Sequence, residues 1–146
     1  MYTGFVSINE EGAFHFKEEK MKAAINGLGR IGRAVFKILM EQDEVELVAV
    51  NDLVPPDNLA YLINHDTVYG RYKWPVNLEG EMLVSNGKKC RALSVKDPSA
   101  LPWKDMGIDI VFECTGIFTK MEDLKKHIDA GAKKVILSAP AKSQEI

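Results

Sequence analysis

Ala23-Ala24-Ile25-Asn26-Gly27-Leu28-Gly29-Arg30-Ile31-Gly32-Arg33 is the stretch that decides the fold of this 146-residue chain. It places Gly27, Gly29 and Gly32 in a G-x-G-x-x-G pattern between an apolar run and an amphipathic helical stretch. In this pattern the first glycine permits a tight turn, the second lets backbone approach a pyrophosphate, and the third lets helix and strand pack closely. Free N–H groups at the start of the helix attract the phosphates. The stretch therefore predicts a strand, a turn and a helix that bind a dinucleotide.

An acidic residue at the expected distance strengthens this prediction. Asp52 lies twenty residues after Gly32, at the end of a second apolar run over residues 46–50. A carboxylate at the end of the second strand accepts hydrogen bonds from a ribose diol and repels a 2′-phosphate, so the sequence predicts NAD rather than NADP. The alternative, a glycine-rich turn without a ligand, leaves this carboxylate without an explanation.

Outward from this unit, strand patterns alternate with helical patterns. We expect strands over residues 22–25, 46–50, 108–113 and 135–137, and helices after the first strand with an apolar face that starts at Ile31, after Pro55 and before Gly131. In the first helix, the spacing predicts an apolar face made of Ile31, Val35, Ile38 and Leu39. Residues 76–84 and 89–95 flank Ser85-Asn86-Gly87, a hairpin signal. The predicted fold is α/β: a Rossmann-type, doubly wound, mostly parallel sheet with an inserted antiparallel hairpin.

Composition excludes several other classes of protein. The net charge of −2 and the scattered basic residues favour neither nucleic acid nor a membrane surface as a partner. No apolar run approaches the roughly 20 residues that span a bilayer. The two cysteines, Cys90 and Cys114, form no C-x-x-C motif, and the three histidines lie far apart, so we expect no metal site. A reducing cytoplasm is the expected compartment, and both cysteines are expected to be buried packing residues.

The first twenty residues differ from the rest of the chain. Residues 5–8 and 13–16 could form a short hairpin, and Met21 directly precedes the first strand of the nucleotide-binding unit. We therefore expect residues 1–20 to be an extension and residues 21–146 to form the nucleotide-binding domain.

Five motifs, in order along the chain, resemble phosphorylating glyceraldehyde-3-phosphate dehydrogenases. The resemblance covers residues 22–142, and erythrose-4-phosphate dehydrogenases share much of it. The motifs lie at residues 25–33, 50–53, 64–71, 113–119 and 131–142.

The resemblance implies a role for individual residues in binding NAD. Backbone N–H groups of Arg30 and Ile31 would contact the pyrophosphate, and Asp52 the adenosine ribose. Lys96 matches a basic residue beside the adenine that is often Arg in the family, so the charge is kept but the planar stacking surface is lost. The adenine and ribose side would be lined by Thr115, Gly116 and Phe118. Ser138 would approach the nicotinamide ribose. Asn26 is expected to make a structural hydrogen bond that holds the glycine turn.

The implied activity is oxidation and phosphorylation of an aldehyde phosphate, with hydride transfer to NAD. The family's catalytic cysteine lies in Ser-Cys-Thr-Thr-Asn, about twenty residues beyond the matched stretch, so we expect this NAD-binding domain to be incomplete, to lack catalytic residues and to bind NAD without turnover. The aldehyde phosphate would need the remaining catalytic half, and the full-length family usually forms homotetramers. Two alternatives remain: an erythrose-4-phosphate dehydrogenase, and a non-catalytic module for NAD binding or protein interaction.

Overall fold

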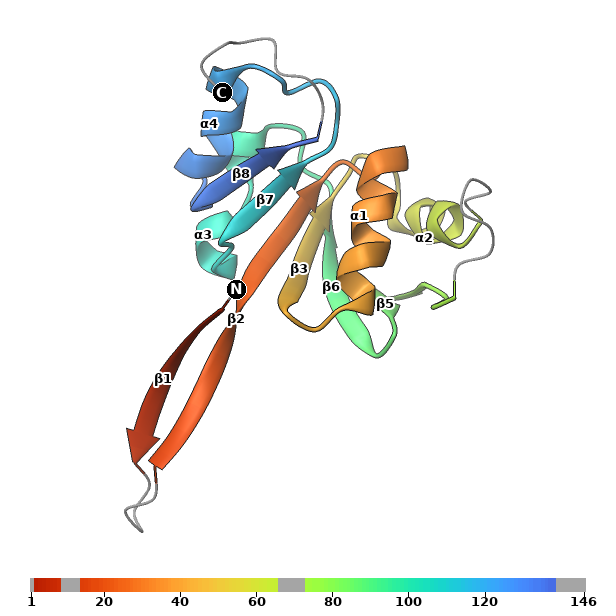
Figure 1. Cartoon of the computed structure of the whole chain (residues 1–146). Helices are drawn as coiled ribbons and strands as arrows, with labels where there is room; N and C mark the ends of the chain where they lie inside the picture. Colours follow the sequence, from red (N-terminus) through yellow and green to blue (C-terminus); the bar gives the residue numbers. More distant parts are fainter. Residues whose placement is uncertain (1, 9–13, 66–72, 139–146) are drawn as a thin grey trace.

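A computed structural model of the chain describes residues 2–8, 14–65 and 73–138. In these ranges eight strands form one sheet, with the order β4-β5-β6-β3-β2-β7-β8 and with β1 paired to β2 (Figure 1). The parts of the family-like motifs at residues 66–71 and 139–142 lie outside the described residues. The strands are β1 (Tyr2–Ile8), β2 (Phe14–Asn26), β3 (Val45–Asn51), β4 (Asn77–Glu79), β5 (Met82–Ser85), β6 (Lys88–Leu93), β7 (Ile110–Glu113) and β8 (Lys134–Leu137).

The centre of the sheet is parallel, as predicted. Strand β2 pairs in parallel with both β3 and β7, while β6 and β8 extend the parallel sheet on either side. Because parallel strands share one direction, their carboxyl ends meet at the same edge, where such sheets bind ligands. The connecting segments are α1 (Arg30–Glu41), α2 (Pro56–Asn64), the short 3₁₀ helix η1 (Pro98–Ala100), α3 (Trp103–Met106) and α4 (Met121–Asp129).

Both faces of the sheet are buried, which makes the fold doubly wound. Ala23 and Ile25 of β2 belong to a core with Phe36 of α1 on one face. Ala24, between them, belongs to a second core with Trp103 on the other face. Neighbouring residues of a strand point to opposite faces, so β2 contributes side chains to both cores. The predicted Rossmann-type fold is confirmed.

The inserted antiparallel segment is present, but its first strand is shorter than predicted. β5 and β6 pair antiparallel across Asn86 and Gly87, whose φ angles of 52° and 73° suit a two-residue hairpin turn. The predicted strand over residues 76–84 is wrong as a single element. It is split into β4 and β5 by a turn at Gly80, with φ of 62°, a conformation that glycine adopts without strain.

The predicted apolar face of α1 is right for Leu39, which is buried, and for Val35, which packs against the core, but it is wrong for Ile31 and Ile38. Ile31 and Ile38 are 50% and 63% exposed, whereas Phe36 and Met40 are buried. The reason is Gly32, where an added Cβ would overlap the carbonyl oxygen of Gly27. The helix approaches the sheet through this glycine, so the residues four and eight positions later face the core. In α4, similarly, Ile128 is exposed while His127 is fully buried.

At its amino end the sheet continues into a two-stranded ribbon, as the hairpin pattern predicted. β1 pairs antiparallel with β2 from Ile8↔Phe14 to Tyr2↔Lys20. From Met21 onward β2 pairs with β3 instead, without a break in the strand. Figure 1 shows the ribbon projecting away from the helices. No helix in the described part of the chain is both long and apolar enough for a membrane span.

Candidate functional site

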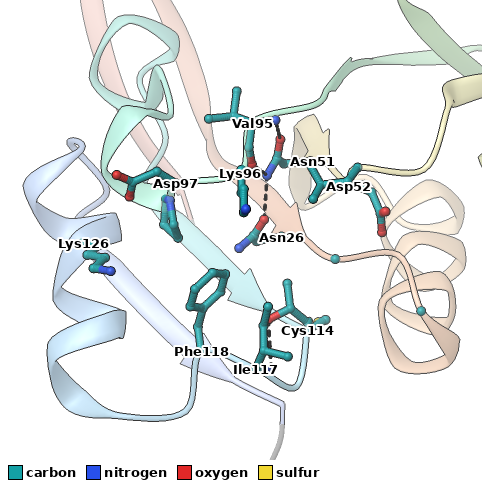
Figure 2. Close-up of a pocket in the computed structure, with 15 residues that line it drawn as sticks. Asn26, Asn51, Asp52, Val95, Lys96, Asp97, Cys114, Ile117, Phe118 and Lys126 are labelled. Carbon is teal, nitrogen blue, oxygen red and sulfur yellow. Dashed lines mark hydrogen bonds between the residues drawn. The ribbon is translucent and has the colours of Figure 1, made fainter.

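A pocket of about 720 Å³ lies at the carboxyl ends of the parallel strands (Figure 2). It is enclosed by the glycine turn after β2, by the ends of β3 and β7, and by the loop after β6. The lining residues are Asn26, Gly27, Gly29, Asn51, Asp52, Leu53, Val95, Lys96, Asp97, Pro98, Cys114, Thr115, Ile117, Phe118 and Lys126.

The three motif glycines perform three different structural tasks. Gly27 has φ of +93°, and an added Cβ there would lie 2.8 Å from Thr115, so this position needs a glycine. Gly32 permits the close contact between the helix and the turn. Gly29 caps α1 in an extended conformation, and an added Cβ would meet no described heavy atom within 4 Å. The turn is therefore closed on its sheet side and open beside Gly29, which lines the pocket.

The carboxylate of Asp52 is fixed beside this turn. Oδ2 accepts a hydrogen bond from the N–H of Leu28 at 2.7 Å, and Oδ1 accepts one from the N–H of Val54 at 2.9 Å. The acid is thus held between the loop after β2 and the loop after β3. Each carboxylate oxygen has capacity for a further hydrogen bond, so the group can accept donors from a ligand.

The opposite side of the pocket combines cationic and apolar side chains. Lys96 and Phe118 come from the loops after β6 and β7, and Figure 2 shows them on two sides of the pocket, with Ile117 beside Phe118. Lys126 of α4 also lines this side. Its side chain is 42% exposed, so it lines the pocket and still contacts solvent. Its ammonium lies 3.8 Å from the carboxylate of Asp123.

A buried hydrogen-bond network lies behind the pocket. Asn51 donates to Oδ1 of Asn26 at 2.8 Å, and Asn26 donates to Oε1 of Glu113 at 2.7 Å. Asn51 also exchanges two hydrogen bonds with the backbone of Val95. At the other end, Nε2 of His127 lies 2.8 Å from Oε1 of Glu113. The network therefore connects the ends of β3, β2 and β7 with α4.

Sequence reasoning anticipated part of this network. The expected structural hydrogen bond of Asn26 is present, although it joins neighbouring strands, while the turn itself is held by Gly27 N–H donating to the carbonyl of Asn51 at 2.8 Å. Sequence reasoning missed Glu113 and His127, since they are separated by 14 residues with no local pattern between them.

Both cysteines are buried, as predicted, and their environment favours the protonated thiol. Burial raises the pKa of the Cys90 thiol to about 12. Burial also raises the pKa of the Cys114 thiol. The charge of Glu113 raises this pKa further, whereas a hydrogen bond with the hydroxyl of Ser138 lowers it. A thiol that keeps its proton is a poor nucleophile, so Cys114 is a packing residue of the pocket wall. The described residues contain no group of three or more His, Cys, Asp or Glu suited to a metal ion.

The structure brings six of the predicted site residues together in this pocket. They are Gly27, Gly29, Asp52, Lys96, Thr115 and Phe118. The other five lie outside its lining: Gly32 contacts the turn, Arg30 and Ile31 begin α1, Gly116 has φ of 77° in the loop after β7, and Ser138 donates its hydroxyl to the carbonyl of Glu113 at 2.9 Å.

Known proteins are similar to this sequence over most of its length. Residues 21–121 match the family model described as glyceraldehyde 3-phosphate dehydrogenase, NAD binding domain. A glyceraldehyde-3-phosphate dehydrogenase of Geobacillus stearothermophilus is 50% identical over 126 residues, which are 86% of this chain and 38% of that protein. One from Chlamydia pneumoniae is 51% identical over 123 residues, 84% of this chain and 37% of that protein. The chain thus spans somewhat more than a third of the length of these relatives.

Proposed function

Because the chain belongs to the glyceraldehyde-3-phosphate dehydrogenase family, whose NAD-binding domain it matches, we propose that it binds NAD in the pocket at the carboxyl ends of β2, β3 and β7. The observation that carries this proposal is the carboxylate of Asp52, held by the N–H groups of Leu28 and Val54 beside the open glycine turn. A fixed carboxylate next to a helix start is the arrangement that selects a ribose diol together with a pyrophosphate.

Each part of the dinucleotide has a matching group in the chain. The pyrophosphate lies against Gly29 and the backbone N–H groups of Arg30 and Ile31. Asp52 accepts from the hydroxyls of the adenosine ribose. The adenine side is formed by Lys96, Thr115, Gly116 and Phe118, and Ser138 lies toward the nicotinamide ribose. The polar groups orient the ligand while Phe118 and Ile117 exclude water from its apolar faces.

For the whole protein we propose the activity named for its relatives. NAD supplies the acceptor for a hydride, and the reaction oxidises and phosphorylates glyceraldehyde 3-phosphate. The names of the relatives favour this substrate over erythrose 4-phosphate, and they favour an enzyme domain over a non-catalytic binding module. We further propose that residues 1–20 are an extension to the NAD-binding domain, that the whole protein is a homotetramer, and that it acts in the cytoplasm.

Calorimetric titration of the full chain with NAD and with NADP tests the proposal. Wild type is expected to bind NAD and to discriminate against NADP, because Asp52 repels a 2′-phosphate. Asp52→Asn keeps the size of the side chain but removes its charge. We expect this variant to lose about 1.5–3 kcal/mol of NAD binding free energy, which is a roughly ten- to hundredfold weaker affinity. The same variant should discriminate less against NADP.

Asp129→Asn is the matched control, because it makes the same change of charge at an exposed position of α4 outside the pocket lining. Its affinity for NAD should equal that of wild type. Equal affinity of wild type for NAD and NADP would contradict the role of Asp52, and no binding of NAD at all would contradict the proposed function.

A further inference from the structure

The side chain of Glu113 is fully buried, and both of its carboxylate oxygens are occupied. Oε1 is 2.7 Å from Nδ2 of Asn26 and 2.8 Å from Nε2 of His127. Oε2 accepts from the N–H of Thr115 at 2.9 Å and from its hydroxyl at 2.6 Å. Four groups therefore converge on one carboxylate at the end of β7, immediately behind the pocket wall.

The ring of His127 donates to this carboxylate. The indole N–H of Trp103 can only donate, and it lies 3.0 Å from Nδ1 of His127. Nδ1 must therefore accept, which places the ring proton on Nε2, facing Glu113. His127 is thereby held as the neutral Nε2–H tautomer, and all four partners of Glu113 are donors. These four donors give the carboxylate a single orientation.

This arrangement determines what Thr115 can offer to a ligand. Its hydroxyl proton is committed to Glu113, so Oγ1 can only accept further hydrogen bonds. The N–H of Ile117 approaches the same oxygen at 3.3 Å. Because Thr115 lines the pocket, the wall presents a hydrogen-bond acceptor at a fixed position there.

We propose that Glu113 is the positioning residue of the pocket, which holds Thr115 as an obligate acceptor for a donor group of the bound dinucleotide. Such a donor is a sugar hydroxyl or an exocyclic amine, and a phosphate oxygen is excluded, since it has no proton to give. The inference rests on the proposed binding of NAD. Glu113 itself does not contact the ligand and acts through Thr115.

Glu113→Gln tests the inference by calorimetric titration of the full chain with NAD. The carboxamide replaces one of the two acceptor oxygens with an NH₂ donor. This donor then faces either the two donors of Thr115 or the donors of Asn26 and His127. The expected result is an NAD Kd about tenfold higher than in wild type. Glu79→Gln, at an exposed position of β4, is the matched control and should leave the Kd unchanged.

A second pair of variants separates positioning from a general loss of structure. Thr115→Val removes the hydroxyl at nearly constant volume, whereas Thr115→Ser keeps the hydroxyl and removes only the methyl group. Thr115→Ser should bind NAD more tightly than Thr115→Val. If Glu113 acts through Thr115, the combined Glu113→Gln and Thr115→Val changes should cost less than the product of the two single effects.

The tautomer of His127 gives a readout that does not depend on NAD. Nitrogen NMR of the histidine rings, assigned with His127→Gln, is expected to show His127 neutral at pH 7, with its proton on Nε2. A doubly protonated ring or a proton on Nδ1 would overturn the inference. The inference would also be overturned if wild type binds NAD and Glu113→Gln binds it with unchanged affinity. Failure of wild type to bind NAD, with the proton on Nε2 of His127, would overturn the proposed function and the ligand role of Thr115 with it.

Discussion

The two walls of the pocket are built by opposite means. The wall around Gly27 and Gly32 is made of backbone, and it depends on side chains being absent, because a Cβ at either glycine would meet the neighbouring chain. The wall behind Thr115 depends on buried polar side chains that satisfy one another. Asn26 and Glu113, which meet there, are 87 residues apart in the sequence.

The difference concerns how each wall fails. The glycine turn is disrupted when an added side chain overlaps neighbouring backbone atoms, because close-packed backbone cannot move aside. The Glu113 network fails by loss of a partner, since a buried polar group without its hydrogen bond carries the full cost of its desolvation. Substitutions chosen for each wall should therefore differ in size and in what they affect.

The largest effect is expected for Gly32→Ala. The new Cβ overlaps the carbonyl oxygen of Gly27, so helix α1 must shift away from the sheet. We expect the free energy of unfolding to fall by about 3 kcal/mol, measured by denaturant titration.

Gly29→Ala is the matched control within the same motif. Its Cβ meets no described heavy atom within 4 Å, and its φ of −73° suits any residue. The loss of stability should stay within about 1 kcal/mol, the cost of a poorer helix cap, while NAD binding weakens because the methyl group lies against the pocket. Equal destabilisation by both variants would contradict the division of tasks between the two glycines.

An intermediate effect is expected for Trp103→Phe in the other wall. The change removes the donor to Nδ1 of His127 and leaves that buried nitrogen without its partner. We expect a loss of about 2 kcal/mol in the free energy of unfolding. Trp74→Phe, at a partly buried position, should cost less than half of that. Should the two tryptophan variants lose the same stability, the hydrogen bond from Trp103 to His127 would not stabilise the fold.

The smallest effect is expected for Cys90, a buried residue outside both walls whose thiol pKa is raised by desolvation alone. Desolvation raises the pKa of its thiol from 9.0 to about 12 in the folded chain. A raised folded pKa means that the unfolded thiol ionises first, so this contribution is complete below about pH 9 and is lost as the pH rises toward 12.

The free energy of unfolding of wild type, relative to Cys90→Ala, should therefore fall by about 1 kcal/mol between roughly pH 8 and pH 9.5. Denaturant titrations of both proteins at the two pH values measure this difference. A difference that does not change with pH would contradict the raised pKa.

The glycine wall could be predicted from the sequence because its information is local. Gly27, Gly32 and Asp52 form a spaced pattern whose mechanical reasons are known, and the parallel core follows from the alternation of strands and helices. The face of α1 was mispredicted in part, because hydrophobic spacing favours Ile31 and Ile38, while the actual face is determined by the closest backbone contact at Gly32. Local patterns do not include that contact.

The second wall could be predicted only in part. Thr115 followed from the strand end and from the family resemblance, and Phe118 followed from the resemblance alone. Glu113, His127 and Lys126 did not, since a buried acid, a buried histidine and a pocket lysine acquire their surroundings only when β7, α3 and α4 come together. In sequence they read as an ordinary strand end and an ordinary charged helix.

Helix α1 begins at Arg30 behind a glycine that offers no capping side chain, and its first turn contains no acidic residue. Amide protons at the start of a helix have no partner within the helix itself. In the proposed NAD complex, the pyrophosphate would supply the acceptor that a serine or aspartate cap provides in other helices. In that complex the ligand itself caps helix α1, so NAD binding and the stability of that end of the domain are linked.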